Sequence, residues 1–288
     1  MGATANWRVI YNGYSDGHHN MAVDEAIMES VGAQIVPPTL RIYGWSPPAV
    51  SLGRFQEVDQ QVDTEALRQR GWGLVRRPTG GRAILHDDEV TYSVCVPQDQ
   101  IEDGHSIIRS YRCLSQGIQR GLELLGVEAE LGRESPATGG KGNGHQQSAI
   151  CFSHSTRADM VAAGRKIVGS AQVRRNGTIL QHGSVPITLD ISDHLAVMPG
   201  DGSSNKPESL RQAAVGVSRM LGRDVSYDEL AEALVTGFSQ ALAVELQAGE
   251  LSAQEQARAE HLSVHKYGTE AWNLTVPSRR TTSSAGRQ

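Results

Sequence analysis

The chain lacks the marks of several protein classes. It has three cysteines among 288 residues and no Cys-x-x-Cys pair, so it is unlike a disulfide framework. No run of about 18 apolar residues occurs, which argues against a membrane span. The N-terminal sequence MGATANWRVI has neither a basic start nor an apolar run. We therefore expect no secretory signal and a cytoplasmic location.

Excess positive charge and several catalytic motifs are also missing. The 27 Lys and Arg residues are outnumbered by 32 Asp and Glu residues, which gives a net charge of −5. We therefore expect no general nucleic-acid partner. There is no HExxH pair for zinc, no Gly-Lys-Ser/Thr end of a P-loop and no GxSxG elbow. The sequence thus predicts no bound metal, no P-loop nucleotide site and no α/β-hydrolase triad.

The residues that are present suffice for a globular protein. Hydrophobic residues make up 39% of the chain, and a chain of this size buries roughly three quarters of its unfolded surface. Expected strands precede residue 190 and expected helices follow it, which indicates an α+β (mixed α/β) fold. We expect a first domain over 1–200 with a mobile loop at 132–148. A helical C-terminal extension over 201–275 and a disordered tail over 276–288 would follow.

Local patterns predict the individual elements. Asn20 is expected to cap a helix that ends near Val31, with Met21, Ile27 and Met28 on its apolar stripe. Apolar and polar residues alternate strictly over 90–96, which predicts a strand. An Asn-Gly pair between two such runs predicts a hairpin. Other strands are expected at 7–11, 39–45, 49–54, 74–77, 82–86, 157–163, 166–174 and 178–188, and other helices at 63–70, 106–125, 207–221, 226–246 and 252–265.

The segment from Arg76 to Asp87 is the richest in potential chemistry. Gly80 and Gly81 allow a ligand to approach the backbone, because neither residue carries a Cβ. Arg76, Arg77 and Arg82 flank them and can hold phosphate or carboxylate oxygens. The segment fits a phosphate-bearing substrate, but a hairpin turn with solvated arginines is an equally good interpretation.

A lysine begins a second candidate segment. Lys166 starts a strand of small and apolar residues, where partial desolvation would lower its pKa and make it reactive. An exposed lysine at the end of a strand is the commoner case.

One cysteine stands out from the other two. Cys151 lies in a polar stretch after the Gly-rich segment, whereas Cys95 sits in a regular strand and Cys113 in a helix row. We predict Cys151 to be a nucleophile and the other two to be structural. Its base would be His154, His182 or Lys166, and spacing does not choose among them.

Together these segments resemble the biotin/lipoate protein ligase superfamily. Within it, the chain looks like an octanoyltransferase of lipoate assembly, of the type that acts on the glycine-cleavage H protein. The motifs that carry the resemblance are HNMAVDEAIM at 19–28, LRIYGWSPPAVSLGRFQ at 40–56, RRPTGGRAILHDDEVTYSV at 76–94, GRKIVGSAQVRRNGTILQHGS at 164–184 and KYGTEAWN at 266–273.

The resemblance implies a catalytic domain with a mixed sheet and flanking helices, and acyl transfer through a cysteine thioester. Cys151 matches the nucleophile and Lys166 the lysine of the GRK strand. The donor would be octanoyl-acyl carrier protein, and the acceptor a lysine of the H protein or another lipoyl domain. No cofactor or ATP is implied, and we expect a monomer. The expected substrate-binding residues are Arg76, Arg77, Gly80, Gly81, His86, Gly169, Ser170 and His182.

Three other functions stay open. An ATP-dependent lipoate ligase shares the Arg-Arg-x-x-Gly-Gly segment and the lysine strand but uses no cysteine, and bacterial ligases often carry an added C-terminal domain. A regulatory repressor of the superfamily needs an N-terminal helix-turn-helix, whereas a strand is expected from residue 7. An amidotransferase between lipoyl domains also uses a cysteine, but segment 88–93 looks more like the type that depends on a carrier protein.

Overall fold

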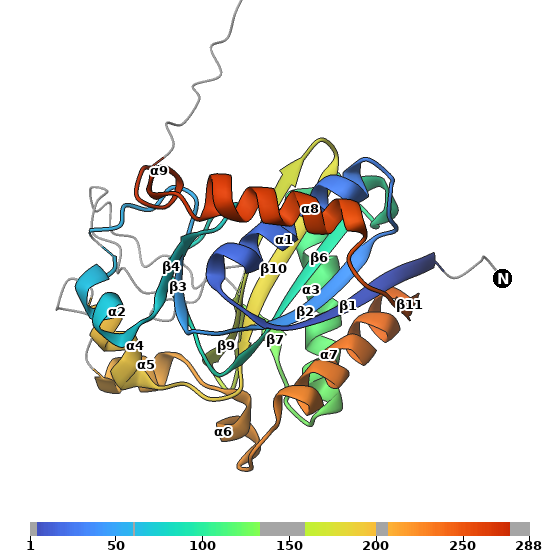
Figure 1. The fold of residues 1–288 in the computed structure, drawn as a ribbon. Helices are drawn as coiled ribbons and strands as arrows, with labels where there is room; N and C mark the ends of the chain where they lie inside the picture. Colours follow the sequence, from blue (N-terminus) through green and yellow to red (C-terminus); the bar gives the residue numbers. More distant parts are fainter. Residues whose placement is uncertain (1–4, 60, 133–158, 200–206, 277–288) are drawn as a thin grey trace, which may run out of the picture.

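A computed structural model describes residues 5–59, 61–132, 159–199 and 207–276 (Figure 1). Its larger sheet has the strand order β11-β1-β2-β6-β10-β9-β8-β7, and a smaller sheet has the order β4-β3-β5. The strands are β1 (Ala5–Ser15), β2 (Thr39–Trp45), β3 (Ala49–Leu52), β4 (Gly73–Arg76), β5 (Ile84–His86), β6 (Glu89–Pro97), β7 (Glu130–Leu131), β8 (Asp159–Ala162), β9 (Arg165–Arg175), β10 (Thr178–Pro186) and β11 (Val244–Ala248).

Helices pack against the larger sheet, and short helices pack against the smaller one. The α helices are α1 (Gly17–Gly32), α2 (Thr64–Arg70), α3 (Ile107–Leu124), α4 (Ile191–Val197), α5 (Pro207–Ala213), α6 (Val217–Leu221), α7 (Tyr227–Leu242), α8 (Ala253–Leu262) and α9 (Glu270–Asn273), with a 3₁₀ turn at Gln98–Gln100 and a π turn at Ser263–Tyr267. The larger sheet pairs parallel strands at β11-β1-β2 and antiparallel strands from β2 to β7. The predicted mixed sheet with flanking helices is therefore confirmed.

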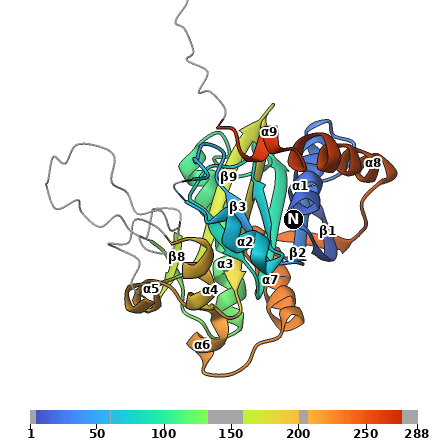
Figure 2. The ribbon, with the colours of Figure 1, turned by 60° about the vertical axis from the view of Figure 1, so that its left-hand side comes forward.

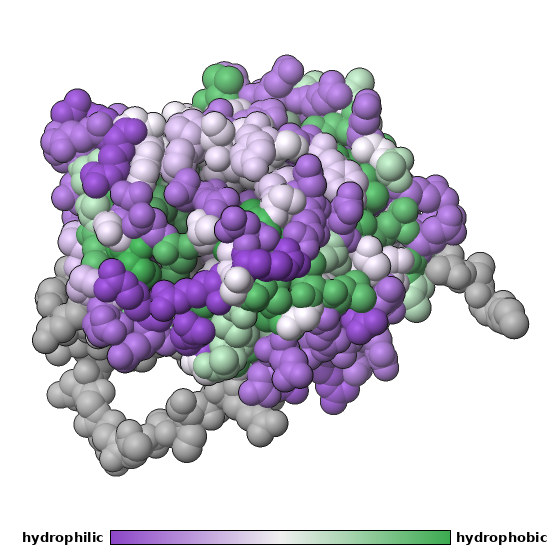
Figure 3. All heavy atoms as spheres, turned by 90° about the horizontal axis from the view of Figure 1, so that it is seen from below, coloured by the Kyte–Doolittle hydropathy of each residue, from purple (hydrophilic) through white to green (hydrophobic). Residues whose placement is uncertain are grey.

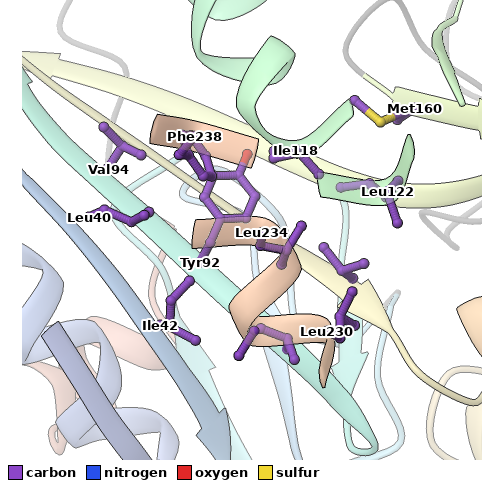
Figure 4. Packing of buried hydrophobic residues seen from close by; sticks show 14 of the residues in the cluster. Leu40, Ile42, Tyr92, Val94, Ile118, Leu122, Met160, Leu230, Leu234 and Phe238 are labelled. Carbon is purple, nitrogen blue, oxygen red and sulfur yellow. The ribbon is translucent and has the colours of Figure 1, made fainter. Parts of the chain in front are cut away.

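The main apolar core lies between the larger sheet and the pair α3 and α7. Tyr92 on β6 contacts Phe238 on α7, with ring centroids 5.5 Å apart (Figure 4). Three glycines bring the two helices together, because a Cβ on Gly117 would lie 2.3 Å from the Phe238 ring and one on Gly237 would lie 2.2 Å from the backbone nitrogen of Gly121. The two helices are therefore closely packed against each other and against the sheet.

The opposite face of the larger sheet is covered by α1, with α8 packed beside it (Figure 2). The predicted apolar stripe of α1 is buried, but the helix begins one turn earlier than expected. Asp16 is its N-cap and accepts a hydrogen bond from the backbone N–H of His19 at 3.0 Å. Asn20, the expected cap, donates to the carbonyl oxygens of Ser15 and Gly44 and so ties α1 to the sheet.

The hairpin between β9 and β10 forms where the Asn-Gly pair predicts it. Asn176 and Gly177 both have positive φ, 49° and 77°, as a two-residue type I′ turn requires. Gly177 also accepts a hydrogen bond from the backbone of Gln98, which fixes the turn against the neighbouring connection. This turn sets the register that places the residues of β9 and β10 opposite one another.

The C-terminal part differs from the helical extension that the sequence predicts. The helix expected over 226–246 ends at Leu242, because Ala243 adopts a left-handed φ of 51°. Val244–Ala248 then pairs with the open edge of β1 as the parallel strand β11, which the apolar spacing of a helix does not reveal. The helix expected over 207–221 is broken into α5 and α6 before Gly216. Most of the expected mobile loop, 133–148, and residues 277–288 of the expected tail lie outside the described residues.

The structure describes no helix long and apolar enough to cross a membrane. Figure 3 shows hydrophobic side chains interspersed with polar ones on the face seen from below.

Candidate active site

A cavity of about 310 Å³ lies between the two sheets. That volume is at the lower end of the ~300–1,000 Å³ typical of small-molecule pockets. Its lining comes from α1, α3, both sheets and the turn after β4: Met21, Tyr43, Trp45, Ser51, Arg77, Gly80, Gly81, Arg82, Ile84, His86, Thr91, Ile107, Tyr111, Asp159, Gly169, Ser170, Ala171, Gln172, His182, Gly183 and Ser184. Seven of the ten predicted site residues line this cavity: Arg77, Gly80, Gly81, His86, Gly169, Ser170 and His182.

His86 lies on one wall of the cavity, held between a hydroxyl and a carboxylate. Its Nε2 lies 2.7 Å from the hydroxyl of Ser51, and its Nδ1 lies 2.8 Å from Glu89. The ring stacks on Trp45 with a centroid distance of 3.9 Å. Glu89 also accepts a hydrogen bond from Ser184 at 2.5 Å, so the imidazole is fixed in one orientation.

His182 stands on the neighbouring wall with a second carboxylate behind it. Its Nδ1 lies 3.0 Å from Asp24 and its Nε2 lies 2.7 Å from the hydroxyl of Thr79. Burial lowers the pKa of His182, although Asp24 opposes that shift. A neutral ring that donates from Nδ1 to Asp24 leaves Nε2 as the acceptor, so Thr79 donates to it. His182 is therefore held as a neutral base at the edge of the cavity.

Asp24 is the centre of a fully buried polar cluster. It accepts hydrogen bonds from Arg41 at 2.8 Å, Tyr43 at 2.9 Å and Ser93 at 2.8 Å. Burial alone would raise the pKa of Asp24, but hydrogen bonds from His182 and Ser93 and the charge of Arg41 outweigh it, and the pKa is lowered. Asp24 is thus a carboxylate that orients His182 from inside the protein.

Lys166 lies near the N-terminal end of β9, and the residue is only 2% exposed. Its ammonium group is 2.5 Å from Asp159, which lines the cavity. Gly169 also lines it, and a Cβ on that glycine would lie 3.3 Å from Nζ of Lys166. The lysine is therefore buried beside the cavity rather than exposed at a strand end.

The three predicted arginines have different positions. Arg76 is fully buried, and its guanidinium donates to five backbone carbonyls, among them Gly53 at 2.9 Å and Asn273 at 2.9 Å. It does not line the cavity, so the structure gives it a structural position instead of the predicted contact with a donor phosphate. Arg77 and Arg82 do line the cavity, and Arg77 donates to the carbonyls of Ser51, Gly80 and Arg82.

The two glycines of the turn differ in what they allow. Gly81 has a φ of +92°, and a Cβ there would lie 2.7 Å from Nη2 of Arg77. A Cβ on Gly80 would meet nothing within 4 Å. Only Gly81 is therefore required by backbone conformation and by space, although both residues line the cavity.

The predicted nucleophile Cys151 and the alternative base His154 lie outside the described residues. Cys95 is fully buried, and burial raises its pKa well above the ordinary value. Burial also raises the pKa of Cys113, which is partly exposed on α3. Neither thiol lines the cavity, in agreement with the structural positions that the sequence predicts for both.

Sequence reasoning missed the carboxylates of the site. Asp24, Glu89 and Asp159 each bond a predicted site residue, but none was singled out. The signal for Asp24 was its place in the apolar stretch that follows Met21, where an unpaired acid would be costly to bury. Asp24 is 158 positions from His182, so only the fold reveals that pairing. Glu89 and Asp159, in contrast, are near their partners in the chain.

Comparison with known proteins identifies the family of the chain. A model of the lipoyl protein ligase A/B catalytic domain matches residues 16–239. The octanoyltransferase LipM of Kyrpidia tusciae is 44% identical over 270 residues, which cover 93% of this chain and 98% of that protein. The octanoyltransferase LipM of Bacillus subtilis is 35% identical and covers 93% of this chain and 97% of its own length.

Solved structures show the same architecture. A crystal structure of lipoate-protein ligase A bound with ATP has a TM-score of 0.76 and 27% identity, and covers 96% of this chain and 100% of its own. A putative lipoate protein ligase from T. acidophilum with bound lipoic acid has a TM-score of 0.75 and 26% identity, with coverages of 94% and 99%.

Proposed function

The chain belongs to the lipoyl protein ligase A/B catalytic domain family, and we propose that it transfers octanoyl from acyl carrier protein to a lysine of a lipoyl-type domain. The single observation that carries this proposal is the likeness to octanoyltransferases at 35–44% identity along 93% of the chain. The glycine-cleavage H protein is the acceptor that we propose. The enzyme is an acyltransferase of lipoate biosynthesis.

The proposed reaction has two steps. In the first, the thiolate of Cys151 attacks the thioester carbonyl of the donor, the bond from the acyl carbon to the carrier sulfur breaks, and the carrier thiolate leaves and takes up a proton. In the second, the acceptor amine attacks the acyl-cysteine, an amide bond forms, and the Cys151 thiolate is released. A thioester exchange followed by amide formation needs no ATP.

The described residues supply the surroundings for these steps. Ile84, Ile107 and Met21 give the cavity an apolar part that suits a saturated acyl chain. Lys166, buried beside the cavity, is our proposed base for the proton that the acceptor amine loses. His182 is the alternative base, because its Nε2 is an acceptor that faces Thr79 at the cavity edge.

An ATP-dependent lipoate ligase is the second candidate, favoured by the fold shared with the ATP-bound ligase. The two candidate functions require different acyl donors. An octanoyltransferase uses octanoyl-carrier protein in the presence of a chelator, whereas a ligase needs a free acid, ATP and magnesium.

Intact-mass measurement separates them. The purified protein is incubated with octanoyl-carrier protein and a chelator, before and after hydroxylamine, which cleaves thioesters. We expect an added octanoyl group that hydroxylamine removes, and then transfer to apo H protein. Cys151→Ala should abolish both signals, while Cys95→Ala and Cys113→Ala should retain them. Octanoylation of H protein only with free octanoate and ATP would establish the ligase instead.

A further inference from the structure

Two cations flank one aromatic ring of α9, and a third cation lies close enough to act on one of them electrostatically. Arg54 and Lys266 lie 4.0 Å and 4.1 Å from the centroid of Trp272. Arg175, at the end of β9, pairs with Glu25 at 2.6 Å, and Lys266 pairs with the other oxygen of the same carboxylate. We call Arg54, Arg175 and Lys266 the cationic cluster.

The cationic cluster has more positive charge than its neighbours neutralise. Glu25 is the one carboxylate that the structure places in an ion pair with Arg175 and Lys266, within the described ranges. The guanidinium of Arg54 makes no hydrogen bond or ion pair with any described residue, and its Nη1 is buried without a partner. Burial and the nearby charge of Arg175 lower the pKa of Arg54. A buried donor left unpaired is costly, so this arrangement favours an incoming anion.

The cationic cluster adjoins the cavity. The backbone N–H of Arg54 donates to the carbonyl of Thr79 at 2.8 Å. The preceding residue, Gly53, packs so closely on the turn that a Cβ there would lie 2.0 Å from the carbonyl oxygen of Gly81. Because Gly80 and Gly81 line the cavity, Arg54 stands directly behind its rim.

The length of β9 between the cavity and the cationic cluster indicates what kind of ligand could reach both. Arg175 is six residues beyond Gly169, the glycine beside Lys166, and six residues of strand span ~20 Å. From phosphorus to sulfur, a phosphopantetheine arm has about 13 bonds, which reach ~15 Å when extended like a peptide backbone. An arm with its thioester beside Gly169 and the Lys166 ammonium therefore ends ~5 Å short of the Arg175 backbone, a distance that a long arginine side chain can span.

We propose that the cationic cluster binds the phosphate group of the donor's phosphopantetheine arm. The proposal rests on the function proposed above and names the part of the donor that this end of the protein recognises. A phosphate suits the cluster because guanidinium groups bind its oxygens with short, charge-assisted hydrogen bonds. Arg76 cannot take this role, since its donors are occupied by backbone carbonyls.

Two small donors that differ only in the phosphate test the proposal. Octanoyl-phosphopantetheine and octanoyl-pantetheine carry the same thioester and the same arm. The KM for transfer to apo H protein is measured with each donor for the wild type, Arg54→Gln and Arg175→Gln. We expect the wild type to favour the phosphorylated donor by about tenfold or more, and each variant to reduce that ratio to about twofold or less.

Arg223→Gln is the matched control. Arg223 forms an exposed ion pair with Glu229 at 2.6 Å, beside α6 at the other end of the molecule (Figure 1). The Arg223→Gln variant should keep the wild-type ratio of the KM values for the two donors. Arg175→Gln leaves Glu25 bonded to Lys266 and Tyr267, so that variant should fold, which thermal unfolding verifies.

Each other outcome overturns the proposal. A wild type with equal KM values for the two donors, or folded variants of Arg54 and Arg175 that keep the full preference, would show that the phosphate binds elsewhere. Loss of the preference in Arg223→Gln as well would show a general charge effect. Transfer from neither donor, nor from octanoyl-carrier protein, would instead refute the proposed function itself.

Discussion

The two faces of β6 are both buried, yet they are built from different chemistry. Val90, Tyr92, Val94 and Val96 belong to the apolar core under α3 and α7. The alternate residues face α1 and the cavity: Thr91 accepts a hydrogen bond from Trp45, and Ser93 donates to Asp24. All of these side chains are at most 2% exposed.

The difference shows why burial by itself does not identify a site. Apolar side chains are satisfied by any close neighbour, whereas each buried polar group needs a particular partner. The polar face therefore holds its side chains in fixed orientations at some cost in stability, and it borders the cavity. We expect substitutions on the cavity side to affect activity more than stability, and substitutions in the apolar core to do the reverse.

The largest effect is expected at Lys166. Lys166→Ala should reduce turnover by about 10²–10⁴-fold, because it removes the proposed base. Lys166→Arg keeps the charge beside Asp159 and should still form the acyl-enzyme but stall in transfer. Single-turnover mass measurements of both steps check this. Full turnover in Lys166→Arg would transfer the role of base to His182.

The apolar core gives the reverse result. Phe238 is fully buried between α7, α3 and Tyr92, so Phe238→Ala should lower the free energy of unfolding by about 3–5 kcal/mol. The fraction that remains folded should keep its KM for the donor. Urea unfolding and steady-state kinetics at low temperature measure the two quantities, and a changed KM at unchanged stability would contradict the assignment of this face to packing.

Asp24→Asn tests the polar side. The substitution keeps the shape of the side chain but removes the charge that faces Arg41 and His182. We expect the loss in unfolding free energy and the loss in transition-state binding to sum to about 2–4 kcal/mol. The activity loss should exceed the loss in Ser93→Ala, which removes one neutral donor to the same carboxylate. Equal effects in the two variants would show that the charge of Asp24 is unimportant.

A smaller effect distinguishes the neighbouring glycines. Gly81→Ala should cost about 1–2 kcal/mol, because L residues rarely adopt a φ of +92° and the new Cβ would press on Arg77. Gly80→Ala is the control, since its Cβ would enter open space. We expect KM for the donor to rise in Gly81→Ala only. A similar rise in both would mean that the backbone conformation is not the cause.

The smallest effect is on the pH dependence of stability. Because burial lowers the pKa of His182 below its ordinary 6.5, the unfolded chain binds a proton more readily just below that pH. The contribution of His182 to the free energy of unfolding is therefore fully present above pH 6.5. It is lost as the pH falls from 6.5 through the lowered pKa of the folded state, with a slope of at most ~1.4 kcal/mol per pH unit. His182→Gln should flatten urea-unfolding stability below pH 6.5, whereas replacement of exposed His261 should not. An unchanged slope in His182→Gln would contradict the shift.

Much of the fold could be predicted from the sequence, because its patterns are local. The alternation over 90–96 predicts β6, the Asn-Gly pair predicts the β9–β10 turn, and helical spacing predicts α3. The prediction fails at Val244–Ala248, where a free edge of β1 offers backbone hydrogen bonds that local spacing cannot show. For the site, the sequence predicts that His86, Gly81 and Lys166 matter through the types of residue and their motifs, and the cavity brings their segments together.

The sequence by itself thus determined the elements, the family motifs and most of the polar residues near the cavity. The tertiary structure decided their partners: Asp24 and His182 are 158 positions apart, and the carbonyls that bind Arg76 belong partly to a segment 197 positions away. The type of a side chain determines which hydrogen bonds it can form. Whether other groups of the protein occupy its donors and acceptors depends on residues that only folding brings near. For that reason Arg76 is surrounded by backbone carbonyls that take its donors, while Nη1 of Arg54 has no partner among the described residues.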